Sequence, residues 1–206
     1  MDEVAEAKGK TTIELWVDLT CPWCYVGKHR LATAIARSED PARFEVRLRS
    51  FELNPGAPTE PEPLERAFIR AHGGDGKAVL DAERKIRDLA QAEGLAFTLD
   101  RSNARTNTVH RVLHYAETLG RGLEFFSSVQ DAFFAGRLNP FDPEALIRFS
   151  QAMGLDEGRV RQVIVSDEFS ANVRADRTEA LELGVTGVPF AVFGRELAVS
   201  GARSSA

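Results

Sequence analysis

The 206-residue chain has only two cysteines, two tryptophans, two tyrosines and two methionines. So few cysteines argue against a disulfide-stabilised scaffold, and a bridge between two cysteines so close in sequence would close too small a loop to add much stability. Positive charge is also scarce, because 26 lysines and arginines are outnumbered by 31 acidic residues and the net charge is -5. This balance gives no electrostatic footprint for nucleic acid.

Long hydrophobic runs are missing as well, and no apolar stretch reaches the roughly 18 residues of a membrane span. Residues 1–12 are acidic, contain lysines and lack an apolar segment. We therefore expect a disordered N-terminal segment and no secretory signal, which favours a cytoplasmic location. Since 43% of the residues are hydrophobic, the chain is long enough to bury one good core.

Both cysteines lie in residues 18–25, which follow an apolar run and open a predicted helix. A Cys-x-x-Cys pair between a strand and a helix is typical of a redox dithiol. The free N–H groups and partial positive charge of a helix start favour the thiolate, which is the form that attacks disulfides. We therefore assign Cys21 as the attacking thiolate and Cys24, one turn later, as the thiol that resolves the mixed disulfide.

The residue pattern around this pair predicts an α/β fold. Residues 13–17 and 44–51 are predicted strands, and the helix between them makes the two strands parallel through a right-handed crossover. Residues 189–193 and 196–200 predict a late β-hairpin with a type II′ turn at Gly194 and Arg195. The part between is helical in pattern, so we expect residues 58–167 to form an all-helical insertion over one edge of the sheet.

Three features together resemble the DsbA-type thioredoxin-like oxidoreductases: Cys-Pro-Trp-Cys-Tyr at residues 21–25, the helical insertion, and Gly-Val-Thr-Gly-Val-Pro-Phe at residues 184–190. Within that group, residues 51–55, 107–111 and 198–202 are similar to phrases of the FrnE-like branch. The resemblance implies a thioredoxin-like domain made of residues 13–57 and 168–206. Family members usually carry a last helix after the hairpin, which we do not expect here, and an uncovered apolar sheet face would favour a homodimer.

The resemblance also implies how substrate is held at the dithiol. Pro189 corresponds to a cis-proline facing the cysteines, and Val188 would present its backbone to an extended peptide or to glutathione. Pro22 and Trp23, between the cysteines, would contact the substrate. The alternative for Trp23 is packing against the helical insertion.

Three further residues line the cleft by the same resemblance: Asn54, Asn107 and Thr108. Each also has a simpler explanation that stays open at this point. Asn54 precedes a proline and suits a turn, whereas Asn107 and Thr108 lie at a helix start and suit N-capping.

The chain departs from the usual thioredoxin pattern at the position of the proton acceptor for the second thiol. Many thioredoxins carry a buried acid six residues before the first cysteine, where this chain has Leu15. The nearest acid is Asp18, which is a candidate proton relay or a residue of the turn that enters the helix.

The sequence favours no metal and no tightly bound cofactor, with glutathione as a possible co-substrate. His110 and His114 have the i, i+4 spacing of metal ligands, but no third ligand is evident, and the edge of an apolar helix stripe explains them. A zinc ion held by the two cysteines would need two more ligands, and no other pair has the required spacing.

Three classes of function follow. The first is a thiol-disulfide oxidoreductase or isomerase that acts on protein or small-molecule disulfides through a mixed disulfide. The second is a glutathione-dependent isomerase or transferase of the 2-hydroxychromene-2-carboxylate isomerase type, although those enzymes carry Ser at the position of Cys21. The third is a non-enzymatic binding or chaperone module.

Overall fold

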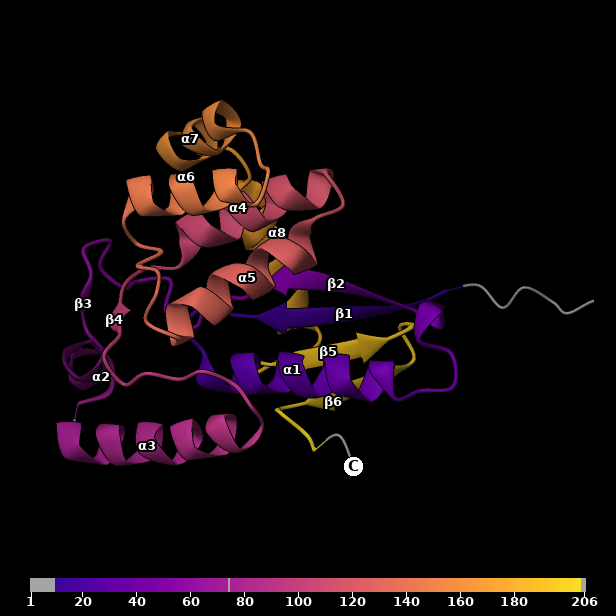
Figure 1. The fold of residues 1–206 in the computed structure, drawn as a ribbon, viewed down its shortest axis with the longest axis horizontal. Helices are drawn as coiled ribbons and strands as arrows, with labels where there is room; N and C mark the ends of the chain where they lie inside the picture. The colour runs from indigo at the N-terminus through magenta and orange to yellow at the C-terminus, as the bar shows by residue number, and fades with distance from the viewer. Residues whose placement is uncertain (1–9, 74, 205–206) are drawn as a thin grey trace, which may run out of the picture.

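The computed structural model describes residues 10–73 and 75–204. Its main sheet has four strands in the order β2-β1-β5-β6 (Figure 1). The strands are β1 (Thr11–Val17), β2 (Phe44–Ser50), β5 (Phe190–Phe193) and β6 (Leu197–Ser200). β1 and β2 are parallel, and β5 and β6 form an antiparallel hairpin. The predicted parallel pair and hairpin are therefore confirmed.

The N-terminal prediction needs one correction. β1 begins at Thr11, so the strand takes in two residues of the segment expected to be disordered, because Thr11 and Thr12 pair with Phe44 and Glu45 of β2. Residues 1–9 lie outside the described residues.

β1 is the central strand and is buried on both faces, as its composition predicted. Ile13 and Val17 belong to the main core cluster on one face. Trp16 points to the other face, where it packs with Phe51 and its Nε1 donates a hydrogen bond to the carbonyl of Asp176 at 2.9 Å. The alternation of period two along a strand explains this division.

Helix α1 (Pro22–Ala36) and a short 3₁₀ helix (Pro41–Arg43) join β1 to β2. The elements between β2 and β5 are β3 (Glu62–Pro63), α2 (Leu64–His72), α3 (Gly76–Ala92), β4 (Ser102–Asn103), α4 (Asn107–Thr118), α5 (Gly122–Phe134), α6 (Pro143–Ala152), α7 (Glu157–Val165) and α8 (Ser170–Glu182). The insertion is therefore not wholly helical, because β3 and β4 pair as a small antiparallel sheet. Strands of two residues are too short to leave a periodic pattern in the sequence.

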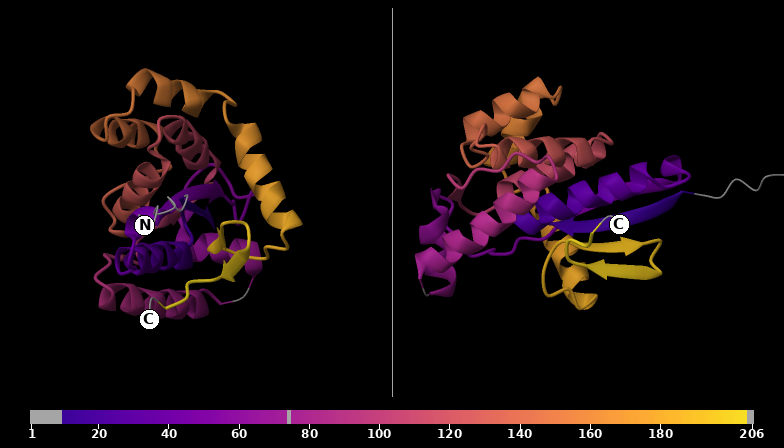
Figure 2. Two further views of the ribbon diagram at one scale, coloured as in Figure 1. Left: turned by 90° about the vertical axis from the view of Figure 1, so that its right-hand side faces the viewer. Right: turned by 60° about the horizontal axis from the view of Figure 1, so that its bottom comes forward.

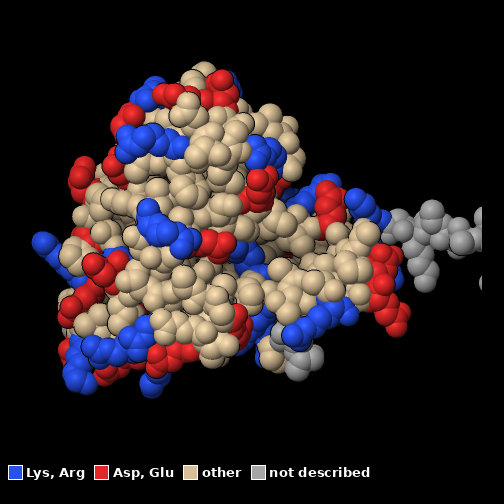
Figure 3. Space-filling view, in the orientation of Figure 1, with Lys and Arg blue, Asp and Glu red and all other residues tan. Residues whose placement is uncertain are grey.

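Helices α4 to α8 gather at the β2 side of the sheet. α4 contacts α5, α7 and α8, while α5 and α8 contact β2 directly. Figures 1 and 2 show the β5–β6 hairpin on the opposite side of β1 from α6 and α7, with α3 beside α1. On the face drawn in Figure 3, basic and acidic side chains are interspersed. Among the described helices, none combines the length and the apolar character that a membrane crossing requires.

The turn of the hairpin differs from the predicted type. Gly194 and Arg195 have φ values of 56° and 63°, and Glu196 donates its N–H to the carbonyl of Phe193 at 3.0 Å. Positive φ at both central residues belongs to a type I′ turn, whereas type II′ needs it only at the first. Arg195 gave no signal for this turn because non-glycine residues seldom adopt positive φ.

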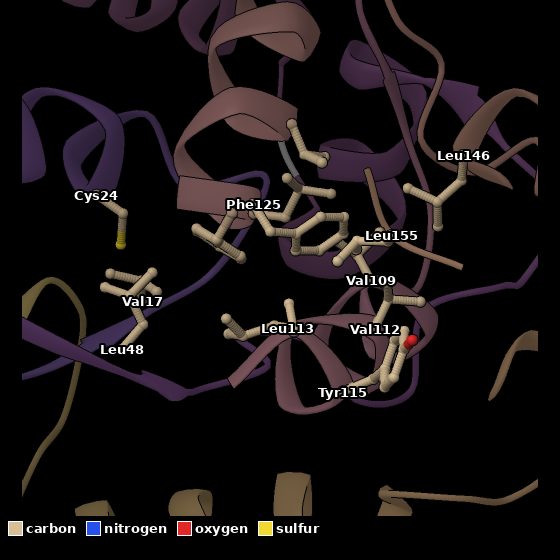
Figure 4. Close-up of a cluster of buried hydrophobic side chains, with 14 of the residues drawn as sticks. Val17, Cys24, Leu48, Val109, Val112, Leu113, Tyr115, Phe125, Leu146 and Leu155 are labelled. Carbon is tan, nitrogen blue, oxygen red and sulfur yellow. The ribbon is translucent and has the colours of Figure 1, made fainter. Parts of the chain in front are cut away.

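The main core joins β1 to helices α4 and α5 and includes both cysteines. Figure 4 shows the sulfur of Cys24 pointing toward Val17. A separate apolar hollow of 170 Å³ lies between α1 and the hairpin, with Leu31, Pro189 and Phe193 in its lining. The homodimer expected from an uncovered apolar face of the sheet stays a prediction.

Candidate functional site

The dithiol is built at the start of α1, where the sequence predicted it. Cys21 is the N-cap residue and Pro22 is the first residue of the helix. The Cys21 sulfur accepts the N–H of Cys24 at 3.3 Å and lies 3.5 Å from the carbonyl oxygen of Val188. Both cysteines are free, with 5% of Cys21 and 0% of Cys24 exposed. Solvent therefore reaches the first cysteine and not the second.

The second thiol needs help to lose its proton. Burial, reinforced by the hydrogen bond and charge of Cys21, raises the pKa of the Cys24 thiol well above its usual range. The N–H of Asp18 lies 3.5 Å from the Cys24 sulfur and acts in the other direction, whereas the Asp18 carboxylate raises the pKa further. Near neutral pH, Cys24 is therefore protonated, and its attack on a mixed disulfide requires a proton acceptor.

The segment before β5 closes over the dithiol from the other side. The Val188–Pro189 peptide bond is cis, and Pro189 is buried. A Cβ atom at Gly27 of α1 would lie 2.7 Å from Cγ of Pro189 and 3.3 Å from Cβ of Ala202. Only glycine fits there without a shift, so Gly27 permits the close approach of Pro189 to α1.

Asp18 is buried beneath the dithiol and is held by several donors. Its Oδ1 accepts the N–H of Leu19 at 2.7 Å, and its Oδ2 accepts the N–H of Leu53 at 2.9 Å. His110 of α4 places its Nε2 3.2 Å from Oδ1, and both side chains of this pair are sealed from solvent. Gln130 of α5 donates to the carbonyl groups of Asp18 and Leu19. Asp18 thus joins the dithiol loop to the loop after β2 and to the insertion.

Sequence reasoning missed His110 as a member of this site. Its spacing to His114 drew attention to the two imidazoles as a pair, but they bind different carboxylates. His114 Nε2 lies 3.1 Å from Oδ2 of Asp176, on α8. In residues 10–73 and 75–204, no three His, Cys, Asp or Glu side chains are arranged to hold a metal ion.

The start of α4 rules out the N-capping explanation of Asn107 and Thr108, whereas their place in the cleft stays a prediction. The N-cap residue is Thr106, which makes no side-chain capping bond, so neither Asn107 nor Thr108 caps the helix. The Asn107 amide instead donates to buried Glu52 at 3.0 Å. Thr108 accepts a hydrogen bond from Arg111 at 3.5 Å. Asn107 therefore ties α4 to the loop that carries Leu53, whereas the hydrogen bond of Thr108 stays within α4.

The other predicted substrate-binding residues of the dithiol turn and the loop after β2 are at least partly exposed. Trp23 is 43% exposed, so the insertion does not enclose it. Pro22 is half-buried. Asn54 is exposed, and its carbonyl oxygen accepts the N–H of Ala57 at 3.1 Å in a turn, which fits its simpler explanation.

Together, the four-stranded mixed sheet, the Cys-x-x-Cys at the first helix and the cis-proline before β5 define a thioredoxin-like fold. Residues 12–206 match the model of the DSBA-like thioredoxin domain family, and the chain belongs to this family.

Solved structures agree with this assignment. A crystal structure described as a probable DsbA oxidoreductase from Streptomyces coelicolor is 36% identical, covers 95% of this chain and 85% of its own, and has a TM-score of 0.88. The cytosolic disulfide reductase DsbM from Pseudomonas aeruginosa is 19% identical, with 92% and 89% covered and a TM-score of 0.63. A 2-hydroxychromene-2-carboxylate isomerase is 18% identical, with 93% and 89% covered and a TM-score of 0.72. The last two share the fold.

Proposed function

We propose that the protein is a thiol-disulfide oxidoreductase or isomerase that works through a mixed disulfide on Cys21. The observation that carries this proposal is the position of the Cys21 sulfur, at the N-terminus of α1 and 3.5 Å from the Val188 carbonyl oxygen. The helix start favours a thiolate. The neighbouring backbone offers an extended substrate a place to pair.

The exchange runs in two balanced steps. The Cys21 thiolate attacks one sulfur of a substrate disulfide, forms a mixed disulfide and releases the other sulfur as a thiolate, which takes a proton. Cys24 then loses its proton and attacks the Cys21 sulfur, and the second substrate sulfur leaves as a thiolate that is protonated in turn. The dithiol gives up two electrons and two protons, and the substrate disulfide gains them. The reverse sequence oxidises a substrate dithiol.

In this proposal, Asp18 accepts the proton of Cys24, and Val188, Pro189, Pro22 and Trp23 hold the substrate around the sulfurs. Exposure of Trp23 beside buried Cys21 supports a role as an apolar contact. Asn54, Asn107 and Thr108 stay predicted cleft residues, with the FrnE-like branch as the proposed place within the family.

Glutathione is the proposed small-molecule co-substrate, and the cytoplasm is the proposed location. DsbM, which shares the fold, is described as cytosolic and has been solved with glutathione. The likeness to the 2-hydroxychromene-2-carboxylate isomerase keeps a glutathione-dependent isomerase or transferase as the second candidate.

A mixed-disulfide trap tests the proposal. Cys24→Ser removes the resolving thiol, so substrates should stay attached to Cys21 in a cell extract and be released by reductant. The matched control is the double variant Cys21→Ser with Cys24→Ser, which should capture nothing. A set of attached proteins supports the oxidoreductase, whereas glutathione alone favours the second candidate. If nothing is attached and a Cys21→Ala variant keeps the activity of the wild type, the protein is a binding or chaperone module.

A further inference from the structure

We propose that His110 is a positioning residue that holds the Asp18 carboxylate as the acceptor for the proton of Cys24. This inference deepens the proposed function and rests on it. His110 does not touch the cysteines, so it acts through Asp18.

The hydrogen bonds of Asp18 leave one place for a proton. A carboxylate offers about four lone-pair positions. Oδ1 accepts from Leu19 N–H and from His110 Nε2, whereas Oδ2 accepts only from Leu53 N–H among the described residues. The unfilled position is therefore on Oδ2, and we assign the proton of Cys24 to it. The three donors hold the carboxylate in one orientation beneath the dithiol loop.

The surroundings of His110 explain why it positions Asp18 and does not carry the proton itself. Its side chain is fully buried, its ring stacks on Phe126 with centroids 5.7 Å apart, and its Nδ1 has no hydrogen-bond partner in the described structure. A neutral imidazole with its hydrogen on Nε2 donates that hydrogen to Asp18. The atom then left without a partner is Nδ1, which carries only a lone pair. A cationic imidazole would bury an unpaired N–H as well, which is costly.

Other ionisable groups near this site have different partners. Lys28 lies one turn after Cys24 on α1, where burial lowers its pKa while Asp131 of α5 and Cys24 act in the opposite direction. Glu52, beside Leu53, is occupied by Arg105 and Asn107. Lys28 is therefore the competing proton acceptor, and a Lys28→Met variant separates the two routes.

Reaction with dithiobis(nitrobenzoate), an aromatic disulfide, isolates the step in which Cys24 acts. Mixed with the reduced protein in equal amount, it should release one coloured thionitrobenzoate when Cys21 attacks. A second should appear when Cys24 attacks the mixed disulfide. Stopped-flow absorbance resolves the two releases, and Cys24→Ser should abolish the second.

His110→Leu should slow the second release at least about tenfold near neutral pH and leave the first unchanged. The deficit should shrink as the pH rises, because hydroxide then deprotonates Cys24 directly. His110→Gln should stay within about threefold of the wild type, because its amide can donate to Asp18. His114→Leu, on the same helix, and Lys28→Met should leave the second release unchanged. If His110→Leu does not fold, His110→Asn takes its place, since its shorter amide does not reach Asp18.

Four results would overturn the inference: a wild-type rate of second release in His110→Leu, a His110→Leu deficit that is equal at every pH, a His110→Gln variant as slow as His110→Leu, or a Lys28→Met variant as slow as His110→Leu. A wild-type protein that shows no first or no second release would instead refute the proposed function. The two failures are thus distinguishable.

Discussion

Helix α4 carries two histidines one turn apart that each bind an aspartate of another element, and only the His110–Asp18 pair lies at the dithiol. His110 and Asp18 are 0% and 2% exposed and lie 3.2 Å apart. His114 and Asp176 are 12% and 5% exposed and lie 3.1 Å apart. The two pairs have the same chemistry and nearly the same geometry, so the difference between them lies in their neighbours.

Asp176 has further strong partners on the β2 side of the sheet. Arg49 pairs with it at 3.2 Å, and Ser50 donates its N–H at 2.8 Å. Arg49 also pairs with Glu14, so this carboxylate belongs to a network of fixed charges. Within the described residues, no lysine or arginine pairs with Asp18. The comparison teaches that a buried carboxylate with a fixed cation is structural, whereas one that keeps an open position beside a thiol can move a proton.

The largest expected effect comes from removing each carboxylate in turn. Asp18→Asn should slow the second thionitrobenzoate release about a hundredfold near neutral pH, because the amide cannot accept the proton of Cys24. Asp176→Asn should leave that rate within about twofold, since no step of the exchange uses it. Equal slowing in both variants would remove the distinction between the pairs.

The close contact between Gly27 of α1 and Pro189 gives the next prediction, which concerns stability. Gly27→Ala should lower the free energy of unfolding by about 2 kcal/mol, because the new methyl group would lie 2.7 Å from Cγ of Pro189. Gly187→Ala is the matched control in the segment before Pro189, since a Cβ there meets nothing within 4 Å. Denaturant titration of both variants measures the difference in unfolding free energy. A Gly27→Ala variant as stable as the wild type would show that α1 and Pro189 are not tightly packed at this position.

The buried thiol adds a pH dependence of stability to the dithiol side. Its pKa is raised above the ordinary value of 9.0, so the native state keeps this proton after the unfolded chain has lost it. Below about pH 9 the Cys24 thiol should therefore not change the free energy of unfolding of the reduced protein. Above that pH, the free energy of unfolding should fall by up to about 1.4 kcal/mol per pH unit. Unfolding titrations of wild type and Cys24→Ala across this range measure the difference. Parallel pH profiles would contradict the burial effect.

The smallest effect is expected on the Asp176 side. His114→Leu should cost about 1 kcal/mol of unfolding free energy, because Asp176 and Ser50 lose a hydrogen-bond partner while Arg49 still pairs with the carboxylate. Thermal unfolding gives the cost. A loss of more than about 3 kcal/mol would mean that this pair holds the fold more firmly than its partners indicate.

The sequence predicted the parts of the fold that have local signals. The strand at residues 44–50 and the helix that begins at Pro22 are specified by near neighbours in the sequence, and the structure contains both. β3 and β4 are strands of two residues each that lie far apart in the sequence and pair only in the folded chain. No local sequence pattern therefore predicts them. The positive φ of Arg195 likewise depends on the hairpin and not on its residue type.

The same division applies to the candidate site. The two cysteines were found because their spacing and place before a helix are local features. The bond between Asp18 and His110 joins residues of different elements, and a helical period shows only which face His110 occupies. Gly27 was missed for the same reason, because its neighbour Pro189 lies far along the chain, just before β5. A buried acid near a Cys-x-x-Cys and a histidine within an apolar stripe are the signals that could have prompted the search.

The most direct test of the central claim is the intact mass of the reduced protein after reaction with dithiobis(nitrobenzoate). We predict that the wild type releases two thionitrobenzoates per chain and retains none, because Cys24 displaces the adduct from Cys21. Cys24→Ser should retain one, and Cys21→Ser should react slowly, since Cys24 is fully buried. A wild-type chain that keeps an adduct on each cysteine, or a Cys21→Ser variant that reacts as fast as the wild type, would contradict the assignment of Cys21 as attacker and Cys24 as resolving thiol.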